Sequence, residues 1–377
     1  MQAVILAAGE SSRFWPLNQK HKSLIKIMGR PLIWHTLKNL ENAGFSEAVI
    51  IQGPKKEIEE ELKNYELTNL KIKYVLQEES LGTGSAIYRA KDFIKEPFWV
   101  LHPYKFYLKD IIGERTKTTL FAVPTNNPED YGILKMESGK VVEICENPPL
   151  GKAPSNLRTL GIYFLTPDFF NYYEKIKKHH PEDLIDALNL LIKERGADTV
   201  VLEKELPTLK YPWDLFSVLE YLLKDIETKI YIGKNCQISP SCHLRGFVSI
   251  GDNCKIGNGV EIKNSIIGDN SKIPHLSYIG DSIIGENCNL GAGTITANLR
   301  FDKKTIKSKV KGNLMDTGRE KFGCVLGNNT QTGINVSLMP GVLIGSNCKI
   351  GPASVVFENL EDNTIFYTEF KGVKKRA

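Results

Sequence analysis

Residues suited to proton transfer and anion binding lie in the second half of the chain. His275 stands in the string PHLSYIGD, and an imidazole can take a proton from an amine near neutral pH. Arg245 and Lys263 are 18 residues apart, and two cations held close together repel unless an anion lies between them. These residues predict proton transfer beside an anion such as a sugar phosphate. The alternative is a solvated corner histidine and two solvated outward charges.

A second candidate site follows the first apolar run. Gly9 and Ser11 can expose backbone N–H groups to an anion, while Arg13 and Lys22 can neutralise phosphate charge. The Walker pattern GxxxxGK[ST] is absent. A simple strand-to-helix turn is the alternative for the glycine and serines taken alone.

A six-residue period predicts the element that positions His275. Apolar residues recur every six positions from Ile232 to Ile262, then continue with two shifts of five, and resume from Leu326 to Val356 after a polar insertion. A hexapeptide period is typical of a β-helix. Three hexapeptides form one triangular coil, so we expect Arg245 and Lys263 on one wall, about 4.8 Å apart.

The cysteines fit this interpretation. Two positions before each periodic residue lies a second inward position, and six of the seven cysteines occupy such positions: Cys236, Cys242, Cys254, Cys288, Cys324 and Cys348. We interpret them as small core residues and expect no metal site among them. Cys145 has no identified partner. An odd cysteine count without CxxC pairs predicts a reduced, cytoplasmic protein.

The first half alternates strand and helix signals. The run 3–9 reads as a buried strand, 32–44 as a helix and 47–53 as a second strand, which predicts a mainly parallel sheet covered on both faces. An apolar-striped helix over 212–226 ends this region. We therefore predict an α/β Rossmann-like domain at 1–225 and a left-handed parallel β-helix with a C-terminal tail at 229–377.

Composition is consistent with two domains. At 377 residues the chain exceeds the roughly 250–300 at which one core stops growing. Its 41% hydrophobic content excludes a disordered chain, and no apolar run approaches the roughly 18 residues of a membrane span. The net charge of +5 comes from interspersed charges, so we expect no nucleic-acid partner and no membrane partner.

Residues 1–225 resemble the sugar-1-phosphate nucleotidylyltransferases, whose signature reads GxGxRxxPL…PK…GKPL. The matching strings are GESSRFWPL at 9–17, Lys22, GRPL at 29–32, and Gln77 with LGTGSA at 81–86. The segment PWDL at 212–215 resembles that family's closing helix. The resemblance implies a site for UTP, dTTP or a sugar nucleotide at Gly9, Ser11, Arg13, Lys22, Gln77 and Gly82.

Departures from this family fall at its metal and sugar-phosphate positions. Tyr104 and Thr208 stand where the family has two Mg²⁺-binding aspartates, and Asn147 replaces its sugar-phosphate lysine. These changes predict impaired or absent nucleotidylyl transfer and argue against Mg²⁺ as a cofactor. Lys105 could supply a fixed positive charge instead, although we expect it to be a surface lysine.

Residues 229–357 resemble the N-acetyltransferase domain of bifunctional amino-sugar-1-phosphate acetyltransferase/uridylyltransferases of the archaeal type. The Arg245-to-Lys263 spacing and the strings HLSY at 275–278 and NLGAGTITAN at 289–298 carry the resemblance. It implies that His275 is the general base and that the Ala292 N–H is the oxyanion donor. The implied substrate contacts are Arg245, Lys263, Tyr278, Asn289 and Asn298.

The resemblance predicts N-acetylation of glucosamine-1-phosphate or galactosamine-1-phosphate by acetyl-CoA, as in UDP-N-acetylhexosamine synthesis. It also implies a homotrimer, or a multiple of it, with sites at subunit boundaries. A fully bifunctional enzyme and a non-catalytic regulatory subunit that senses sugar nucleotides are the alternatives. Either Lys303 or Lys304 matches a further lysine of the family. The basic tail could meet CoA phosphates or remain solvated; its residues are Lys371, Lys374, Lys375 and Arg376.

Overall fold

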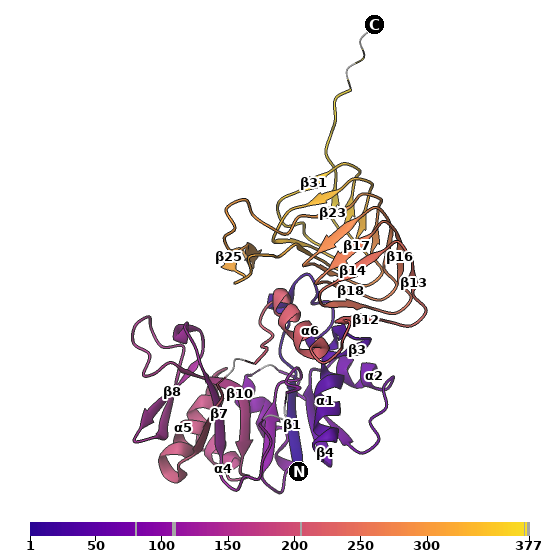
Figure 1. Cartoon of the computed structure of the whole chain (residues 1–377). Helices are drawn as coiled ribbons and strands as arrows, with labels where there is room; N and C mark the ends of the chain where they lie inside the picture. Colours follow the sequence, from indigo (N-terminus) through magenta and orange to yellow (C-terminus); the bar gives the residue numbers. More distant parts are fainter. Residues whose placement is uncertain (80, 108–110, 204–205, 373, 375–377) are drawn as a thin grey trace. The chain divides into compact units, whose positions relative to one another are not determined.

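The computed structural model describes residues 1–377 except 80, 108–110, 204–205, 373 and 375–377 (Figure 1). The chain divides into two compact units, Met1–Glu10 with Leu32–Leu206, and Ser11–Pro31 with Pro207–Ala377. Tail residues Lys375 and Arg376 lie outside the described residues. The domain boundaries at 225 and 229 stay predictions. No helix in the described chain is long and apolar enough to cross a membrane.

The first unit is built on one sheet with the strand order β11-β7-β10-β6-β1-β4-β5, extended by the β8–β9 hairpin. Short apolar runs form its central strands because both faces of the sheet are covered. The strands are β1 (Gln2–Ala7), β4 (Glu47–Gln52), β5 (Lys71–Leu76), β6 (Phe98–Leu101), β7 (Thr119–Pro124), β8 (Gly132–Glu137), β9 (Lys140–Glu146), β10 (Leu157–Leu165) and β11 (Asp198–Val201).

The sheet is more mixed than the sequence predicts. Strands β1, β4, β5 and β6 are parallel neighbours, as expected, but β10 is antiparallel to both β6 and β7. The β8–β9 hairpin reverses the chain before β10, which therefore enters the sheet in the opposite direction. The parallel part still brings the carboxyl ends of β1, β4, β5 and β6 to one edge, where ligands bind in open α/β sheets.

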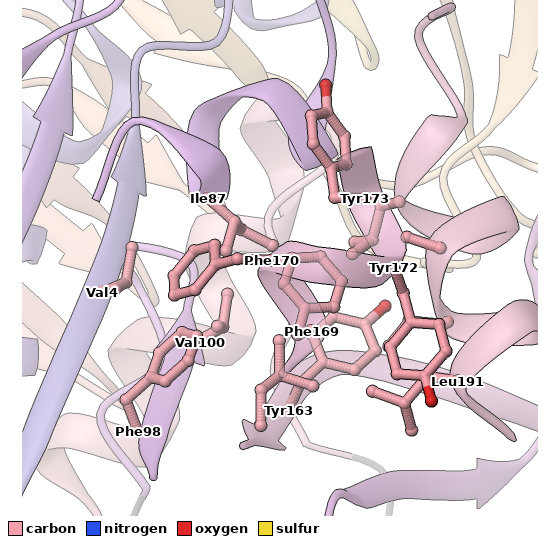
Figure 2. Close-up of a cluster of buried hydrophobic side chains, with 14 of the residues drawn as sticks. Val4, Ile87, Phe98, Val100, Tyr163, Phe169, Phe170, Tyr172, Tyr173 and Leu191 are labelled. Atoms are coloured by element: carbon pink, nitrogen blue, oxygen red, sulfur yellow. The ribbon is translucent and has the colours of Figure 1, made fainter. Parts of the chain in front are cut away.

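Aromatic side chains fill the core between this sheet and its helices. Figure 2 shows Phe98 of β6 beside Phe170 of α4, and their rings stack with centroids 5.5 Å apart. The same cluster includes Val4, Ile87 and Leu191, from β1, α3 and α5. The helices of this unit are α1 (Leu32–Asn42), α2 (Glu57–Leu62), α3 (Thr83–Tyr88), α4 (Phe169–Glu174) and α5 (Asp183–Arg195).

The second unit contains a triangular β-helix with three parallel sheets (Figure 1). We name them walls 1, 2 and 3 in the order in which each coil visits them. Wall 1 contains β12 (Ile230–Ile232), β15 (Val248–Ile250), β18 (Ile266–Ile267), β21 (Ile283–Ile284), β26 (Cys324–Leu326) and β29 (Val342–Ile344). Wall 2 contains β13 (Gln237–Ile238), β16 (Lys255–Asn258), β19 (Lys272–His275), β22 (Asn289–Leu290), β27 (Gln331–Thr332), β30 (Lys349–Ile350) and β32 (Ile365–Phe366).

Wall 3 contains β14 (His243–Arg245), β17 (Glu261–Lys263), β20 (Tyr278–Gly280), β23 (Ile295–Thr296), β28 (Ser337–Leu338) and β31 (Val355–Val356). After β23 the chain leaves the coil and forms a hairpin of β24 (Lys307–Val310) and β25 (Asn313–Asp316). The unit also includes β2 (Lys26–Ile27), β3 (Arg30–Pro31) and helix α6 (Leu215–Leu223).

The β-helix core confirms the inward pattern of the hexapeptides. Ile250, Ile262 and Leu326 are fully buried, and each such side chain stabilises the fold by about 1.5–3 kcal/mol. Cys254, Cys288, Cys324 and Cys348 are buried in the same core, and Cys236 and Cys242 pack against it. Ile232 departs from the pattern and is 43% exposed, because β12 begins the stack and pairs on one side only.

Candidate functional site

The outward face of wall 3 gathers most of the predicted acetyltransferase residues. Strands β14 and β17 pair in register, and Arg245 lies directly opposite Lys263. This pairing confirms that 18 residues make one coil at this position. Leu244 and Ile262 immediately precede the two cations and point into the core. Because side chains alternate along a strand, Arg245 and Lys263 lie on the outer surface.

Each of these two cations is paired with a carboxylate. The Arg245 guanidinium contacts Glu261 Oε1 through both Nε and a terminal nitrogen, at 2.7 and 2.6 Å. The Lys263 ammonium lies 2.8 Å from Asp281 Oδ2. Glu261 and Asp281 therefore supply negative charge beside Arg245 and Lys263, in addition to any anion that the sequence predicts at this position.

Asp281 is the centre of a buried polar network. Its side chain is only 3% exposed, and Lys263 is 13% exposed. The Asn298 amide donates to Asp281 Oδ2 at 2.5 Å and to the Tyr278 hydroxyl at 3.1 Å. The Asn264 amide donates to the other carboxylate oxygen at 3.0 Å. A network satisfied in this way holds its side chains in one arrangement, as a binding site requires.

Tyr278 extends this network along wall 3. It begins β20, while its hydroxyl reaches the far end of the same strand, where a Cβ on Gly280 would lie 2.4 Å from it. Only glycine leaves room for the ring at this position. The structure thus brings together Arg245, Lys263, Tyr278 and Asn298, four of the predicted substrate contacts.

His275 and Ala292 lie together at the turn between walls 2 and 3. His275 ends β19, and Tyr278 begins the next strand three residues later. Lys272 pairs with Asn289, so three residues further on Ala292 stacks on His275, and the Gly293 N–H donates to the His275 carbonyl at 3.3 Å. The His275 side chain is exposed, and within the described chain the Ala292 N–H makes no hydrogen bond. A reactant could reach both groups.

Asn289 lies on a different wall from the other four predicted substrate contacts, although its strand is beside β19, which carries His275. It lies on wall 2, in strand β22, with its side chain exposed. Lys303 and Lys304 are exposed in the insertion after β23, away from regular strands.

Sequence reasoning missed two acidic residues of this site, Glu261 and Asp281. Asp281 follows Lys263 by 18 residues in the sequence. The coil from β17 to β20 has only 17 residues and places Gly280 opposite Lys263, so the repeat alone does not predict the contact with Asp281.

In the first unit, the predicted nucleotide residues lie at or near the carboxyl ends of strands. Gly9 is exposed after β1. Gln77 is buried after β5, and its amide donates to the Gly82 carbonyl at 3.3 Å. Gly82 has φ of +114° and lies against the Pro181 backbone, where a Cβ would clash at 2.5 Å. Gln77 and Gly82 are therefore held together in a turn that requires glycine.

In the second unit, the loop after β1 contributes Ser11, Arg13 and Lys22. The Lys22 N–H donates to Ser11 Oγ at 2.9 Å, and its ammonium donates to the Leu209 carbonyl at 2.8 Å. Burial lowers the pKa of Lys22 to about 8, although nearby Asp214 opposes this shift. Burial raises the pKa of Asp214 to about 6. Arg13 is exposed.

The residues after β6 correct one expectation. Lys105 is not a surface lysine: it is 3% exposed, and its ammonium lies 5.6 Å from the ring centres of Tyr104 and Tyr107. His102 stacks on Tyr104, with ring centroids 5.5 Å apart. A buried cation therefore follows the strand at which the related family carries a metal-binding aspartate.

The other two departures lie outside regular helices and strands. Asn147 is exposed with φ of +44°, and Thr208 is half-buried in the second unit. Within the described residues, no group of three His, Cys, Asp or Glu side chains could hold a metal ion.

Comparison with known proteins agrees with this two-part construction. The Nucleotidyl transferase family model matches residues 2–206, the GMPPB C-terminal domain model matches 226–338, and the Bacterial transferase hexapeptide model matches 323–358. UDP-glucose pyrophosphorylase from Acinetobacter baumanii has the fold of the first part, with a TM-score of 0.51 at 21% identity over 60% of this chain and 94% of that chain.

Two archaeal relatives match almost the whole chain. The Bifunctional protein GlmU of Methanocaldococcus jannaschii is 35% identical over 97% of both chains. The Bifunctional sugar-1-phosphate nucleotidylyltransferase/acetyltransferase of Sulfurisphaera tokodaii is 34% identical over 94% of this chain and 97% of its own. The chain is therefore a transferase and belongs to the family of bifunctional sugar-1-phosphate nucleotidylyltransferase/acetyltransferases.

Proposed function

We propose that the β-helix transfers the acetyl group of acetyl-CoA to the amine of glucosamine-1-phosphate or galactosamine-1-phosphate. The proposal is supported by exposed His275 and the unbonded Ala292 N–H, which lie at the turn that leads into wall 3, and by the Lys263–Asp281–Asn298–Tyr278 network on that wall. Cations and amide donors suit a sugar phosphate, and an accessible imidazole suits a base for its amine.

In the proposed reaction, His275 removes a proton from the ammonium form of the sugar or from the attacking nitrogen. The nitrogen bonds to the thioester carbon, and the carbonyl oxygen becomes an oxyanion that accepts the Ala292 N–H. One such donor contributes about 2.7–4 kcal/mol to transition-state stabilisation. The C–S bond then breaks, and the CoA thiolate takes a proton as it leaves. The buried cysteines take no part in this sequence.

Binding of the sugar phosphate requires rearrangement of charge at wall 3. Arg245 is 46% exposed and its contact with Glu261 can open to solvent, whereas Lys263 and Asp281 are nearly enclosed. We assign Arg245 the mobile contact to the phosphate and Lys263 the fixed one. Placement of Asn289 on wall 2 supports a homotrimer, because a neighbouring subunit could bring its wall 2 to this wall 3.

For the first half, the comparisons favour the fully bifunctional alternative over impaired nucleotidylyl transfer. Relatives that carry the bifunctional name match over nearly their whole length. Buried Lys105 also favours retained phosphate chemistry, because it offers a fixed positive charge after β6. Tyr104 and Thr208 favour the impaired alternative: neither side chain is the carboxylate that Mg²⁺ prefers, so we assign no step to Mg²⁺.

Mass spectrometry of the products tests the proposal. The chain is incubated with acetyl-CoA and either hexosamine-1-phosphate, and we expect a product heavier by one acetyl group. No acetylated product from either sugar would refute the acetyltransferase assignment. A parallel assay of pyrophosphate release from UTP or dTTP, with the N-acetylated sugar phosphate, separates the bifunctional alternative from the impaired one.

A further inference from the structure

The insertion over 299–322 is a strongly basic segment. It contains eight Lys and Arg residues against three Asp and Glu, a net charge of +5 that equals the net charge of the whole chain. It leaves the β-helix directly after Asn298, where Leu299 bridges Lys321 and the Phe322 N–H donates to the Asn298 carbonyl at 3.0 Å. The insertion therefore begins at the turn that carries the proposed sugar-phosphate network.

The hairpin in this insertion has one buried and one exposed face. Along β24, Ser308 and Val310 are buried, whereas Lys307, Lys309 and Lys311 are exposed. The Ser308 hydroxyl donates to the Gly341 carbonyl at 2.7 Å, and the Asn359 amide donates to the Lys309 carbonyl at 2.8 Å. These contacts fix the strand on the β-helix. Successive lysines on its outer face are about 6.8 Å apart.

Nearby acidic residues balance the charge of these lysines only in part, because Asp316 lies opposite Lys307 in the hairpin whereas Leu314 lies opposite Lys309. Asp302 pairs with Arg300, while Asp316 accepts the Thr305 hydroxyl and the Gly318 N–H, each at 2.8 Å. The Lys311 ammonium donates to Ser12 Oγ at 2.7 Å. Within the described residues, the ammonium groups of Lys307 and Lys309 make neither a hydrogen bond nor a salt bridge. Two cations at this spacing favour a ligand with several phosphate groups.

We propose that Lys307 and Lys309 bind the phosphate groups of the acyl donor, acetyl-CoA. The inference rests on the proposed function, which introduces this donor. CoA carries a diphosphate and a ribose 3′-phosphate on a long pantetheine arm. Its phosphates could therefore contact this hairpin, which follows wall 3, while its thioester reaches the amine at the other end of that wall, where His275 lies. The basic tail was the candidate suggested by sequence. Lys307 and Lys309 suit the role because hydrogen bonds hold their strand on the β-helix, which lowers the entropy cost of binding.

The test compares two acyl donors. Acetyl-pantetheine keeps the thioester but has no phosphate, so only acetyl-CoA can contact the two lysines through phosphate. In the double variant Lys307→Gln/Lys309→Gln, we expect kcat/KM for acetyl-CoA to fall about 10- to 100-fold through KM. We expect kcat/KM for acetyl-pantetheine to stay within twofold. The matched control is Lys177→Gln/Lys178→Gln, which removes two exposed lysines from the first unit and leaves both donors unaffected.

Calorimetric binding of CoA and of 3′,5′-ADP gives a readout independent of turnover. Both should bind the double variant at least tenfold more weakly than the wild type. An unchanged KM for acetyl-CoA, or an equal loss with both donors, would overturn the proposal. The proposal would also be overturned if the tail variant Lys371→Gln/Lys374→Gln, and not the hairpin variant, lost kcat/KM for acetyl-CoA. If neither donor supports acetyl transfer in the wild type, the proposed function fails, and calorimetry with CoA still decides whether these lysines bind it.

Discussion

The β-helix and the α/β unit position charge in different ways. In the β-helix, Lys263 lies opposite Gly280 of the next coil and reaches Asp281 one residue further on, so an exposed wall and the turn that follows it bring opposite charges together. In the α/β unit, Lys105 follows a strand and is buried against aromatic rings. Both units keep the fold of their relatives, yet only the β-helix also retains every side chain that its resemblance implies. Fold similarity and site chemistry therefore have to be tested separately in each half.

The largest expected effect is the loss of acetyl transfer on substitution of His275, which should leave the activity of the first half of the chain unchanged. His275→Ala should lower kcat for acetyl transfer by about 10²–10⁴-fold, because no other base replaces the imidazole. Pyrophosphate release, if present, should not change. Thiol release and pyrophosphate release are measured on the same preparation. His243→Ala is the control, since His243 is another exposed histidine of the β-helix and lies on wall 3 rather than wall 2. Similar losses in both variants would contradict a specific role for His275.

A smaller effect on catalysis is expected when the buried ion pair of Lys263 and Asp281 is broken. Lys263→Met removes a charge-assisted contact to the sugar phosphate, worth about 1.5–3 kcal/mol, or about 10- to 150-fold in KM for the sugar. The KM for acetyl-CoA should stay within threefold. Steady-state kinetics with each substrate varied in turn measures both. A KM for the sugar that does not change would remove Lys263 from the proposed site.

Nucleotide binding should respond to the ionisation of Lys22. Because its pKa is lowered to about 8, Lys22 is cationic below that pH and loses its charge as the pH rises from 7 to 9. The affinity for UTP or dTTP should therefore fall about tenfold over this range. Lys22→Arg should abolish the pH dependence, and Lys22→Met should bind weakly throughout. Titration calorimetry at both pH values provides the measurement, and a flat wild-type profile would contradict the assignment.

The smallest effect on activity is expected at the core cysteines. Burial raises the pKa of Cys324 to about 12, so its thiol stays protonated and unreactive. Cys324→Ala should lower the free energy of unfolding by about 1 kcal/mol through lost packing and leave acetyl transfer within twofold. Thermal denaturation and thiol release measure the two effects. Lost transfer with an unchanged Tm would instead place a cysteine in the chemistry.

Sequence periodicity predicted the β-helix well, because small or apolar side chains recur at the inward positions along the whole repeat. The exception at Ile232 arises at the end of the stack, where no further coil covers it. The same period predicted the Arg245–Lys263 register. Prediction was weaker in the α/β unit, since apolar runs do not reveal strand direction, and β10 is antiparallel.

The candidate residues of the site could be predicted from the sequence, but the carboxylates that pair with its cations could not. Spacing reveals which side chains share a wall, whereas the partner of Lys263 is Asp281, which lies one residue past the end of the paired strand β20. Lys105 was misjudged for a similar reason. A lysine is usually exposed, and only the tertiary packing of Tyr104 and Tyr107 shows that this one is buried.

Amine-dependent thiol release tests the central proposal most directly. The wild-type chain is mixed with acetyl-CoA and either glucosamine-1-phosphate or its pre-acetylated form, N-acetylglucosamine-1-phosphate, and the experiment is repeated with the galacto sugars. The account predicts one free thiol per acetylated amine with at least one free amino sugar, and no release above hydrolysis with either blocked sugar. Absence of thiol release with both free amines, or equal release with blocked and free sugars, would contradict acetyl transfer at wall 3.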